Sequence, residues 1–249
     1  MLEPADLGPG ARGGFTTRAG GVSTGPYAAA DGSGGLNLGL HVGDDERAVR
    51  ANRDLLDAEL GSRVVWMDQR HTALVRVVTG EADDGAGQGE CDALVGRRSD
   101  PGAPAVAVMV ADCVPLLLAT PDGGLVAAVH VGRQGLADGV VHAALATLAR
   151  EGASVPDLYA SLGPSICGRC YEVPAALRDE VAGVVPAARA TTAWGTPALD
   201  IPAGVLAQLA DGGVRRVQRL DVCTREDERF YSYRRDGRTG RFVGVVRPA

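Results

Sequence analysis

Three side chains with the chemistry of a reactive centre lie between residues 71 and 130. Cys113 follows an aspartate, His130 comes two residues before Gly132, and His71 follows Gln69-Arg70. A thiol and two imidazoles are donors that hold a catalytic zinc with one position left open for a reactant. A thiol and one imidazole could instead form an activated nucleophile. The residue types leave both interpretations open, so the first question is which elements would bring them together.

A β-hairpin would place Cys113 and His130 side by side. Pro121-Asp122-Gly123-Gly124 is a strong turn signal ahead of an apolar run at 125–129 that predicts a buried strand. If Asp122 and Gly123 are the two turn residues, His130 pairs with Pro115 and lies diagonally beside Cys113, about 7 Å or less away. A register slip of one residue would put the two side chains on opposite faces.

The remaining pattern predicts helices alternating with strands and no boundary between domains. Periodic apolar positions and capping residues predict helices over about 45–60, 136–150, 174–184 and 202–210. Apolar or β-branched runs predict strands at 64–67, 74–78, 105–110, 158–162, 214–222, 230–233 and 242–246, and residues 80–90 predict a solvated loop. No linker or repeat divides residues 1–249, so we expect one α/β-type domain with helices over a mostly antiparallel or mixed sheet.

Composition restricts the classes of function. The formal net charge of −6 argues against a basic surface for nucleic acid, and the absence of lysine excludes Schiff-base chemistry. No apolar run reaches the roughly 18–20 residues of a membrane helix, and Met1–Asp6 does not start a signal peptide. Five cysteines, an odd number spread over 249 residues, suit a reducing compartment. We therefore expect a cytoplasmic protein without nucleic-acid or membrane partners, compatible with a monomer.

Other residues offer chemistry with less specific spacing. Asp112 beside Cys113 favours a site over a lone buried thiol, because a carboxylate costs free energy to bury without a partner. His41 lies in a loop where it could line a pocket, and 230–235 offers aromatic rings and guanidinium groups for a base or a phosphate. Cys167-Gly168-Arg169-Cys170 has CxxC spacing. Its surroundings predict a loop and no second cysteine pair completes a zinc site, so we assign it no redox or metal role.

A series of short motifs runs in order through nearly the whole chain. They are Phe15-Thr16-Thr17-Arg18-x-Gly20-Gly21-Val22-Ser23, Leu36-Asn37-Leu38-Gly39, Gly43-Asp44, Asn52-Arg53, Gln69-x-His71, Ala111-Asp112-Cys113-x-Pro115, His130-x-Gly132, Gly163-Pro164-x-Ile166, Tyr171-Glu172-Val173, Cys223-Thr224 and Tyr231-Ser232-Tyr233-Arg234-Arg235-x-Gly237-x-Thr239-Gly240-Arg241. Together they resemble the YfiH-like, or laccase-domain, family. Its members are often labelled polyphenol oxidases and are now regarded as purine nucleoside phosphorylases with adenosine deaminase activity.

The resemblance implies a layered α/β/β/α fold and a zinc held by His71, Cys113 and His130, with copper able to replace it in vitro. It implies phosphorolysis of adenosine, inosine, guanosine and methylthioadenosine, with purine nucleosides and phosphate as partners, and deamination of adenosine. Asp112 would join the three metal ligands as a catalytic residue and shuttle a proton. The expected substrate-binding residues are Arg18, Asn37, Arg53, Gln69 and Arg133.

Two other hypotheses use the same residues. The fold also resembles cysteine hydrolases and toxin deamidases that use a Cys-His pair, which would make Cys113 the nucleophile and His130 the base. Under the second of these hypotheses, the protein is a non-catalytic module, and the metal only stabilises its fold. A multicopper mechanism is excluded by counting, because it needs many histidines and the chain has four, with no His-x-His pair.

The chain departs from the family at one motif. Where the family commonly reads His-Ala-Gly-Trp-Arg-Gly, residues 130–135 read His-Val-Gly-Arg-Gln-Gly. Arg133 therefore occupies the tryptophan position and Gln134 the arginine position. We expect Arg133 to contact the substrate in place of that arginine, from one position earlier.

Overall fold

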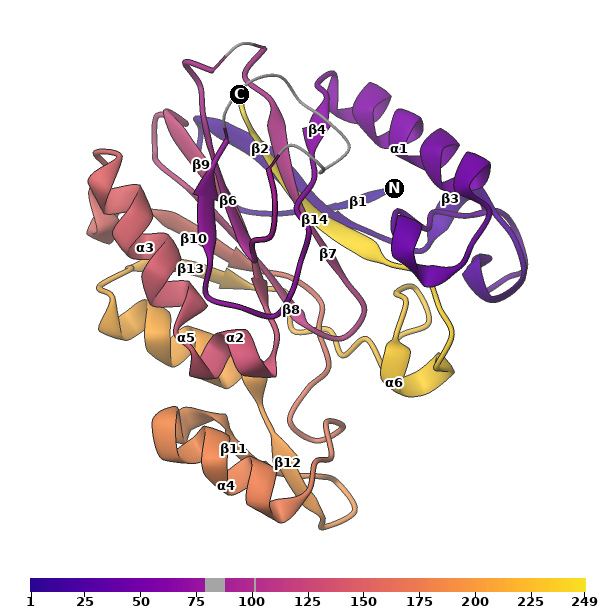
Figure 1. Cartoon of the computed structure of the whole chain (residues 1–249), viewed down its shortest axis with the longest axis vertical. Coiled ribbons are helices and arrows are strands. Elements are labelled where there is room, and N and C mark those ends of the chain that lie inside the picture. The colour runs from indigo at the N-terminus through magenta and orange to yellow at the C-terminus, as the bar shows by residue number, and fades with distance from the viewer. Residues whose placement is uncertain (79–87, 101) are drawn as a thin grey trace.

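Two β-sheets stacked face to face, with helices on both outer sides, organise the chain (Figure 1). This computed structural model describes residues 1–78, 88–100 and 102–249, so most of the loop predicted at 80–90 lies outside the described residues. The first sheet has the order β1 (Leu2–Pro4), β2 (Ala11–Thr16), β14 (Phe242–Pro248), β7 (Ala105–Val110) and β4 (Val64–Val65). The second has the order β13 (Arg216–Arg219), β10 (Tyr159–Leu162), β8 (Val114–Ala119), β9 (Leu125–Val131), β6 (Ala93–Arg97) and β5 (Val75–Val77).

Helices cover the outer face of each sheet. Helix α1 (Glu46–Leu60) lies on the side of the first sheet, and α2 (Arg133–Ala137), α3 (Val140–Arg150) and α5 (Ile201–Asp211) lie on the side of the second (Figure 1). Helix α4 (Ala175–Val184) packs with the small hairpin β11 (Arg189–Thr191) and β12 (Pro197–Leu199). Strand β3 (Ala19–Ser23) contacts α1, and the short α6 (Tyr233–Asp236) precedes β14. The layers thus run helix, sheet, sheet, helix, as expected for an α/β/β/α fold.

The alternation of side chains along each strand separates three apolar layers. In β7, Val106, Val108 and Val110 face the second sheet, whereas the residues between them face α1. In β8, Leu117 and Ala119 face the first sheet, whereas their neighbours pack against α3 and α5. Both faces of each central strand are therefore buried, which explains why these strands are apolar without interruption.

The predicted hairpin is confirmed in its register. Strands β8 and β9 pair antiparallel with Pro115 opposite His130 and Val114 opposite Val131. The turn is closed by the Gly123 amide, which donates to the carbonyl of Thr120. Parallel pairs such as β10–β13 and β5–β6 make the second sheet mixed, as predicted.

Two predicted elements were wrong. The helix expected over 136–150 is two helices, because Gly139 adopts a φ of 83° that turns the chain between α2 and α3. The strand expected over 230–233 is a loop that leads into α6, whose first turn is capped by Ser232. Phe230 and Tyr231 are fully buried, so their aromatic character reflects anchoring in the core and not strand formation. None of the helices in the described ranges combines the length and the apolarity needed to cross a bilayer.

Candidate metal centre

The fold brings His71, Cys113 and His130 together at one end of the stacked sheets. One donor atom from each lies within 4.8 Å of the others. The Cys113 Sγ is 3.8 Å from the His71 Nε2, and the two imidazole rings meet edge-on with centroids 4.6 Å apart. Of the three, His130 is buried, Cys113 is partly exposed and His71 is exposed.

Strand parity and backbone geometry explain why the three side chains converge. His130 shares the face of β9 that carries Val126 and Ala128 toward the other sheet, and Cys113 packs at the edge of the same layer. His71 lies between β4 and β5 with a φ of 60°, a left-handed conformation that non-glycine residues adopt infrequently. Asp112 has a φ of 91°, so the backbone just before Cys113 is strained.

The residue that holds both histidines is Asp92, which was not identified from the sequence. Its Oδ1 accepts hydrogen bonds from the His130 Nδ1 at 2.7 Å and the His71 amide at 2.9 Å. Its Oδ2 accepts from the amides of Arg70 and Thr72 and from the Thr72 hydroxyl. A carboxylate only accepts, so His130 carries a proton on Nδ1, and Nε2 is the nitrogen that a metal can bind after losing any proton of its own. In the sequence, the only sign of this role is that Asp92 directly precedes the apolar strand β6. A carboxylate buried there costs free energy unless hydrogen-bond donors surround it.

The electrostatics of the centre favour a charged thiolate. Burial raises the pKa of the Cys113 thiol, but the His130 and His71 imidazoles outweigh burial and lower it from 9.0 to about 6. Burial lowers the pKa of His130, and the Cys113 thiolate and Asp92 reverse this and raise it to about 9. Burial likewise raises the pKa of Asp92, but the bonds from His130 and Thr72 hold it well below its usual range. Between about pH 6 and pH 9, the metal-free centre therefore holds the Cys113 thiolate, the His130 imidazolium and the Asp92 carboxylate side by side.

A cavity of about 640 Å³ opens over the three donors, within the usual size range of small-molecule sites. Of the expected site residues, Asp112, Gln69 and Arg133 line it together with the three donors, and so does His41. The Gln69 side chain is fixed by a pair of hydrogen bonds to the backbone of Met109, both at 2.8 Å. Arg133 begins α2 directly after Gly132, whereas the Gln134 amide donates to Asp138 on the exposed surface.

Asp112 lines the cavity with both carboxylate oxygens engaged. The Thr224 hydroxyl donates to Oδ1 at 2.7 Å, and the Arg234 amide donates to Oδ2 at 2.6 Å. The Asp112 carbonyl accepts from the Ile166 amide. These contacts tie the strained turn before Cys113 to three distant segments, so the carboxylate is well placed to position the thiol.

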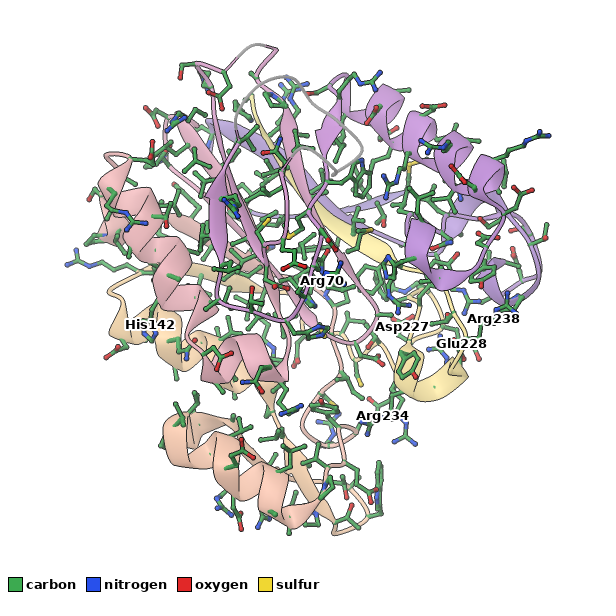
Figure 2. All side chains as sticks on the ribbon, in the orientation of Figure 1. Arg70, His142, Asp227, Glu228, Arg234 and Arg238 are labelled. Carbon is green, nitrogen blue, oxygen red and sulfur yellow. The ribbon has the colours of Figure 1, made fainter. Side chains whose placement is uncertain are left out.

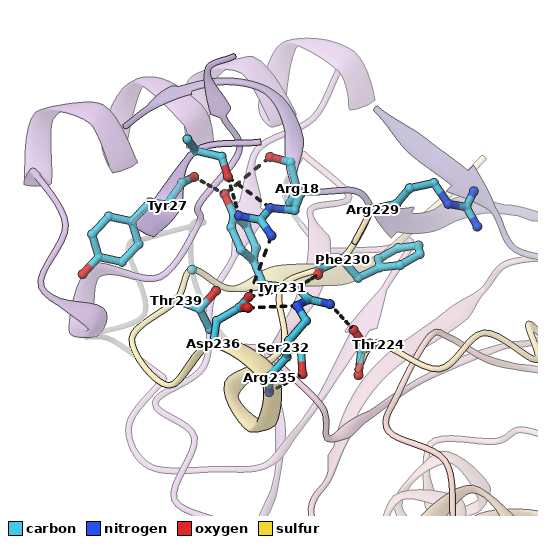
Figure 3. Close-up of polar contacts among 12 residues, drawn as sticks. Arg18, Tyr27, Thr224, Arg229, Phe230, Tyr231, Ser232, Arg235, Asp236 and Thr239 are labelled. Carbon is cyan, nitrogen blue, oxygen red and sulfur yellow. Dashed lines mark hydrogen bonds and ion pairs between the residues drawn. The ribbon is translucent and has the colours of Figure 1, made fainter. Parts of the chain in front are cut away.

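The other three expected substrate-binding residues do not line the cavity. Arg18 donates to the Ala28 carbonyl, lies 3.8 Å from Asp236 and stacks over Tyr231 (Figure 3). Asn37 is fully buried, and its side chain bonds to Asp44 and to the backbone at Gly39 and Arg241. Arg53 lies over the Trp66 ring and donates to the Leu38 carbonyl. The structure thus places all three in contacts that join the N-terminal loops to the rest of the fold.

Arginines and aromatic rings from the C-terminal half complete the cavity wall. Arg234, labelled in Figure 2, lies with its guanidinium 4.9 Å from the centre of the Tyr171 ring and donates to the Glu172 carbonyl. Arg241 and Tyr233 also line the cavity. The 230–235 segment, singled out from sequence for its aromatic and guanidinium groups, thus contributes Tyr233 and Arg234 to the site.

A second group of possible metal ligands lies outside this cavity. Donor atoms of Cys167, Cys170, Cys223 and Glu226 are within 4.8 Å of one another, and none of these residues lines the cavity. The sequence alone leaves the CxxC pair incomplete, because its partners are one cysteine and one glutamate that lie 56 residues further along the chain.

The donors of the first centre fit a zinc ion. Bonds of about 2.3 Å to sulfur and about 2.0 Å to nitrogen put such donors roughly 3.6 Å apart around a tetrahedral zinc. The Sγ of Cys113 and the Nε2 of His71 are 3.8 Å apart. Three donors at the floor of an open cavity would leave a fourth position around such an ion open to a reactant.

Comparison with known proteins identifies the family. The family model described as multi-copper polyphenol oxidoreductase laccase matches residues 12–248. A purine nucleoside phosphorylase of Streptomyces coelicolor is 50% identical over 249 residues, with 99% of each chain covered. The purine nucleoside phosphorylase YfiH of Shigella flexneri is 37% identical over 242 residues, covering 93% of this chain and 91% of the relative.

Solved structures agree with this assignment. A Neisseria meningitidis protein of the DUF152 family superposes with a TM-score of 0.85 at 35% identity, covering 99% of this chain and 98% of that one. YlmD from Geobacillus stearothermophilus superposes with a TM-score of 0.84 at 32% identity, covering 96% and 92%. The chain therefore belongs to the laccase-domain, or YfiH-like, family.

Proposed function

We propose that this chain is a zinc-dependent purine nucleoside phosphorylase that also deaminates adenosine. The observation that carries the proposal is a three-donor centre at the floor of a cavity whose walls hold arginines and aromatic rings. Relatives at 50% and 37% identity over nearly their whole length are named purine nucleoside phosphorylases, which supports the same reaction class here. The substrates proposed are adenosine, inosine, guanosine and methylthioadenosine, together with phosphate.

His71, Cys113 and His130 would hold the zinc, and Asp92 would hold the two histidines in the required orientation. When bound, zinc supplies a positive charge beside the reactants and makes water a stronger nucleophile at neutral pH. The low pKa of the Cys113 thiol keeps it in the thiolate form that binds metal near neutral pH. Copper could occupy the same donors in vitro, because thiolate and imidazole also bind it.

In phosphorolysis, a phosphate oxygen attacks the C1′ carbon of the ribose while the bond from C1′ to the purine nitrogen breaks. The purine leaves with a proton, and ribose 1-phosphate is the second product. Arg133, Arg234 and Arg241 line the cavity and offer guanidinium groups that bind phosphate through paired hydrogen bonds. The faces of Tyr171 and Tyr233 suit a purine ring. Arg133 would thus contact the anion from the tryptophan position of the family motif.

Deamination uses the same cavity with water in place of phosphate. Water adds to the C6 carbon of adenine, the amino group leaves as ammonia, and inosine remains. Asp112 borders the cavity beside Cys113 and is the acidic group we assign to proton transfer. Both reactions take place in the cytoplasm, where the five unpaired cysteines remain reduced.

A cysteine hydrolase is the competing function, and one observation favours it. The lowered pKa of Cys113 and the raised pKa of His130 are those of a thiolate-imidazolium nucleophile. The position of His71 weighs against it, because a two-residue nucleophile does not need a second imidazole 3.8 Å from the sulfur. Asp92 orients His71 as well as His130, which suits a set of metal ligands better.

Substitution of His71 separates the two functions. For a zinc phosphorylase, His71→Ala and Cys113→Ala each lose bound zinc and each lose phosphate-dependent release of adenine from adenosine. For a cysteine hydrolase, His71→Ala retains activity, and iodoacetamide inactivates the metal-free protein by labelling Cys113. Metal content and adenine release, measured on the same preparations, decide between them. His142→Ala, on the exposed outer face of α3, is the control and keeps both.

A further inference from the structure

Three thiols and one carboxylate converge from two turns outside the cavity. Cys167, Cys170, Cys223 and Glu226 each offer one donor atom, and these atoms lie within 4.8 Å of one another. We propose that these four residues hold a second zinc-class divalent cation, which fixes the two turns together. Thiolate-rich donor sets favour zinc over the oxygen-seeking cations, and four protein ligands make a closed, structural site.

The two turns present their ligands with the same spacing. In the first, the Cys170 amide donates to the Cys167 carbonyl at 2.9 Å, which places two thiols three residues apart on one side. In the second, the Glu226 amide donates to the Cys223 carbonyl at 3.1 Å, which places a carboxylate three residues after a thiol. Paired ligands separated by two residues are the usual framework of closed zinc sites. Here a glutamate takes the place of the fourth cysteine.

Backbone hydrogen bonds between the two turns hold the four donor residues close together without a metal. The Ser165 amide donates to the Val222 carbonyl, and the Thr224 amide donates back to the Ser165 carbonyl. The Cys167 amide donates to the Cys223 Sγ at 3.4 Å, which joins the two turns directly at two of the ligands. Gly168 packs so closely on Asp200 that a Cβ would lie 2.7 Å from the Asp200 Cβ. The ligands are therefore held in place by the fold and need only a small contraction around a metal.

The charges around the cluster suit a cation. The Glu226 Oε1 is 3.3 Å from the Cys170 Sγ, while its Oε2 is 3.7 Å from the Arg169 guanidinium. This ion pair is exposed and leaves the other carboxylate oxygen facing the sulfurs. A divalent cation bound among the three thiols and this carboxylate would balance the negative charge that they carry as ligands.

This second metal would act on the first centre through Asp112. Thr224, next to Cys223, donates its hydroxyl to the Asp112 Oδ1, and Ile166, next to Cys167, donates its amide to the Asp112 carbonyl. Both turns therefore hold the strained residue that precedes Cys113. The role is structural: the cation positions a residue of the cavity wall and does not touch a substrate.

Counting zinc on folded protein tests the proposal. Native mass spectrometry of the zinc-saturated wild type should show about two zinc ions per chain. Cys223→Ser and Cys113→Ser should each retain about one, and the double variant none. Cys91→Ala is the matched control, because Cys91 belongs to neither cluster, and it keeps both ions. We also expect Cys223→Ser to lower the melting temperature by about 5–10 °C while the zinc of the cavity is kept.

A wild type that binds one zinc per chain at saturation, with that ion retained in Cys223→Ser, overturns the proposal. So does an intact mass that shows Cys167 joined to Cys170 or Cys223 by a disulfide in protein prepared without oxidant. Cys113→Ser leaves the second cluster intact, so a folded Cys113→Ser protein without zinc also overturns the proposal, and failure of Cys223→Ser to fold does not obscure the result. The count is also independent of nucleoside cleavage, which keeps this test separate from that of the proposed function.

Discussion

Replacing Asp92 with asparagine tests whether one buried carboxylate organises the metal centre. Its two oxygens accept five hydrogen bonds, from the amides of Arg70, His71 and Thr72, the Thr72 hydroxyl and the Nδ1 of His130. An asparagine offers one accepting oxygen, so whichever way its amide turns, an NH₂ group faces two or three of these donors. The substitution keeps the shape of the side chain and removes its charge, so packing is unchanged.

The size of the effect can be worked out from the hydrogen bonds that the substitution removes. A hydrogen bond to a charged group contributes about 1.5–3 kcal/mol, so losing two of them lowers the free energy of unfolding by about 3–6 kcal/mol. For a chain of this length, that corresponds to a melting temperature roughly 10 °C lower. If the new NH₂ faces His130, its Nδ1 must become an acceptor, which moves the proton to the nitrogen that would bind zinc. We therefore expect the zinc affinity to fall by about 10–100-fold.

The assay is zinc competition against a chromophoric chelator, with thermal unfolding recorded on the same samples. Asp211→Asn is the matched control, because Asp211 also pairs with a histidine, His142, at 3.2 Å, but on the exposed surface of α3 and α5. His142 lies well away from Arg70 in Figure 2. An exposed pair contributes less than about 1 kcal/mol, so this control should match the wild type in both measurements. Wild-type zinc affinity and stability in Asp92→Asn would refute the role assigned to this carboxylate.

Three further perturbations probe the packing and the electrostatics. Gly132→Ala should weaken zinc binding about tenfold or more in the same competition assay, because its Cβ would lie 2.5 Å from the His71 Cδ2; unchanged affinity would contradict the close approach of this ring to the backbone. Because the pKa of Cys113 is lowered to about 6, the thiolate exists above that pH and is lost below it. Iodoacetamide labelling of metal-free protein should therefore rise through about pH 6, stay level above it and stop when zinc is added, whereas a midpoint near 9.0 would disprove the lowered pKa. Leu117→Ala, in the layer between the sheets, should reduce the free energy of unfolding in denaturant by about 2–5 kcal/mol with zinc content unchanged, and a loss under about 1 kcal/mol would argue against close packing there.

The parts of the site that lie within one hairpin could be predicted from sequence. The turn at 121–124 sets the register by local chemistry alone, so the pairing of His130 with Pro115 followed from counting residues. His71 could not be placed in this way, because a loop carries it to the hairpin. Its position beside Cys113 rested on the family resemblance and agrees with the geometry.

What could not be predicted depends on contacts between distant segments. Asp92 lies 38 residues from His130 and is recognisable in sequence only as an acid before an apolar strand. Glu226 completes the cysteine cluster from 56 residues beyond Cys170, and no spacing rule based on cysteine pairs includes it. Arg18 was assigned to the substrate by its motif, whereas the fold engages it with Ala28 and Asp236.

The most direct test of the proposed activity is the product formed from adenosine by zinc-saturated protein, followed by ³¹P magnetic resonance with and without phosphate. We predict that phosphate is consumed as adenine and ribose 1-phosphate appear in equal amounts, and that this conversion is lost in His71→Ala. Without phosphate, only the slower formation of inosine should remain. Failure to form ribose 1-phosphate from any of the four proposed nucleosides, in protein shown to carry zinc at His71, Cys113 and His130, would contradict the proposal.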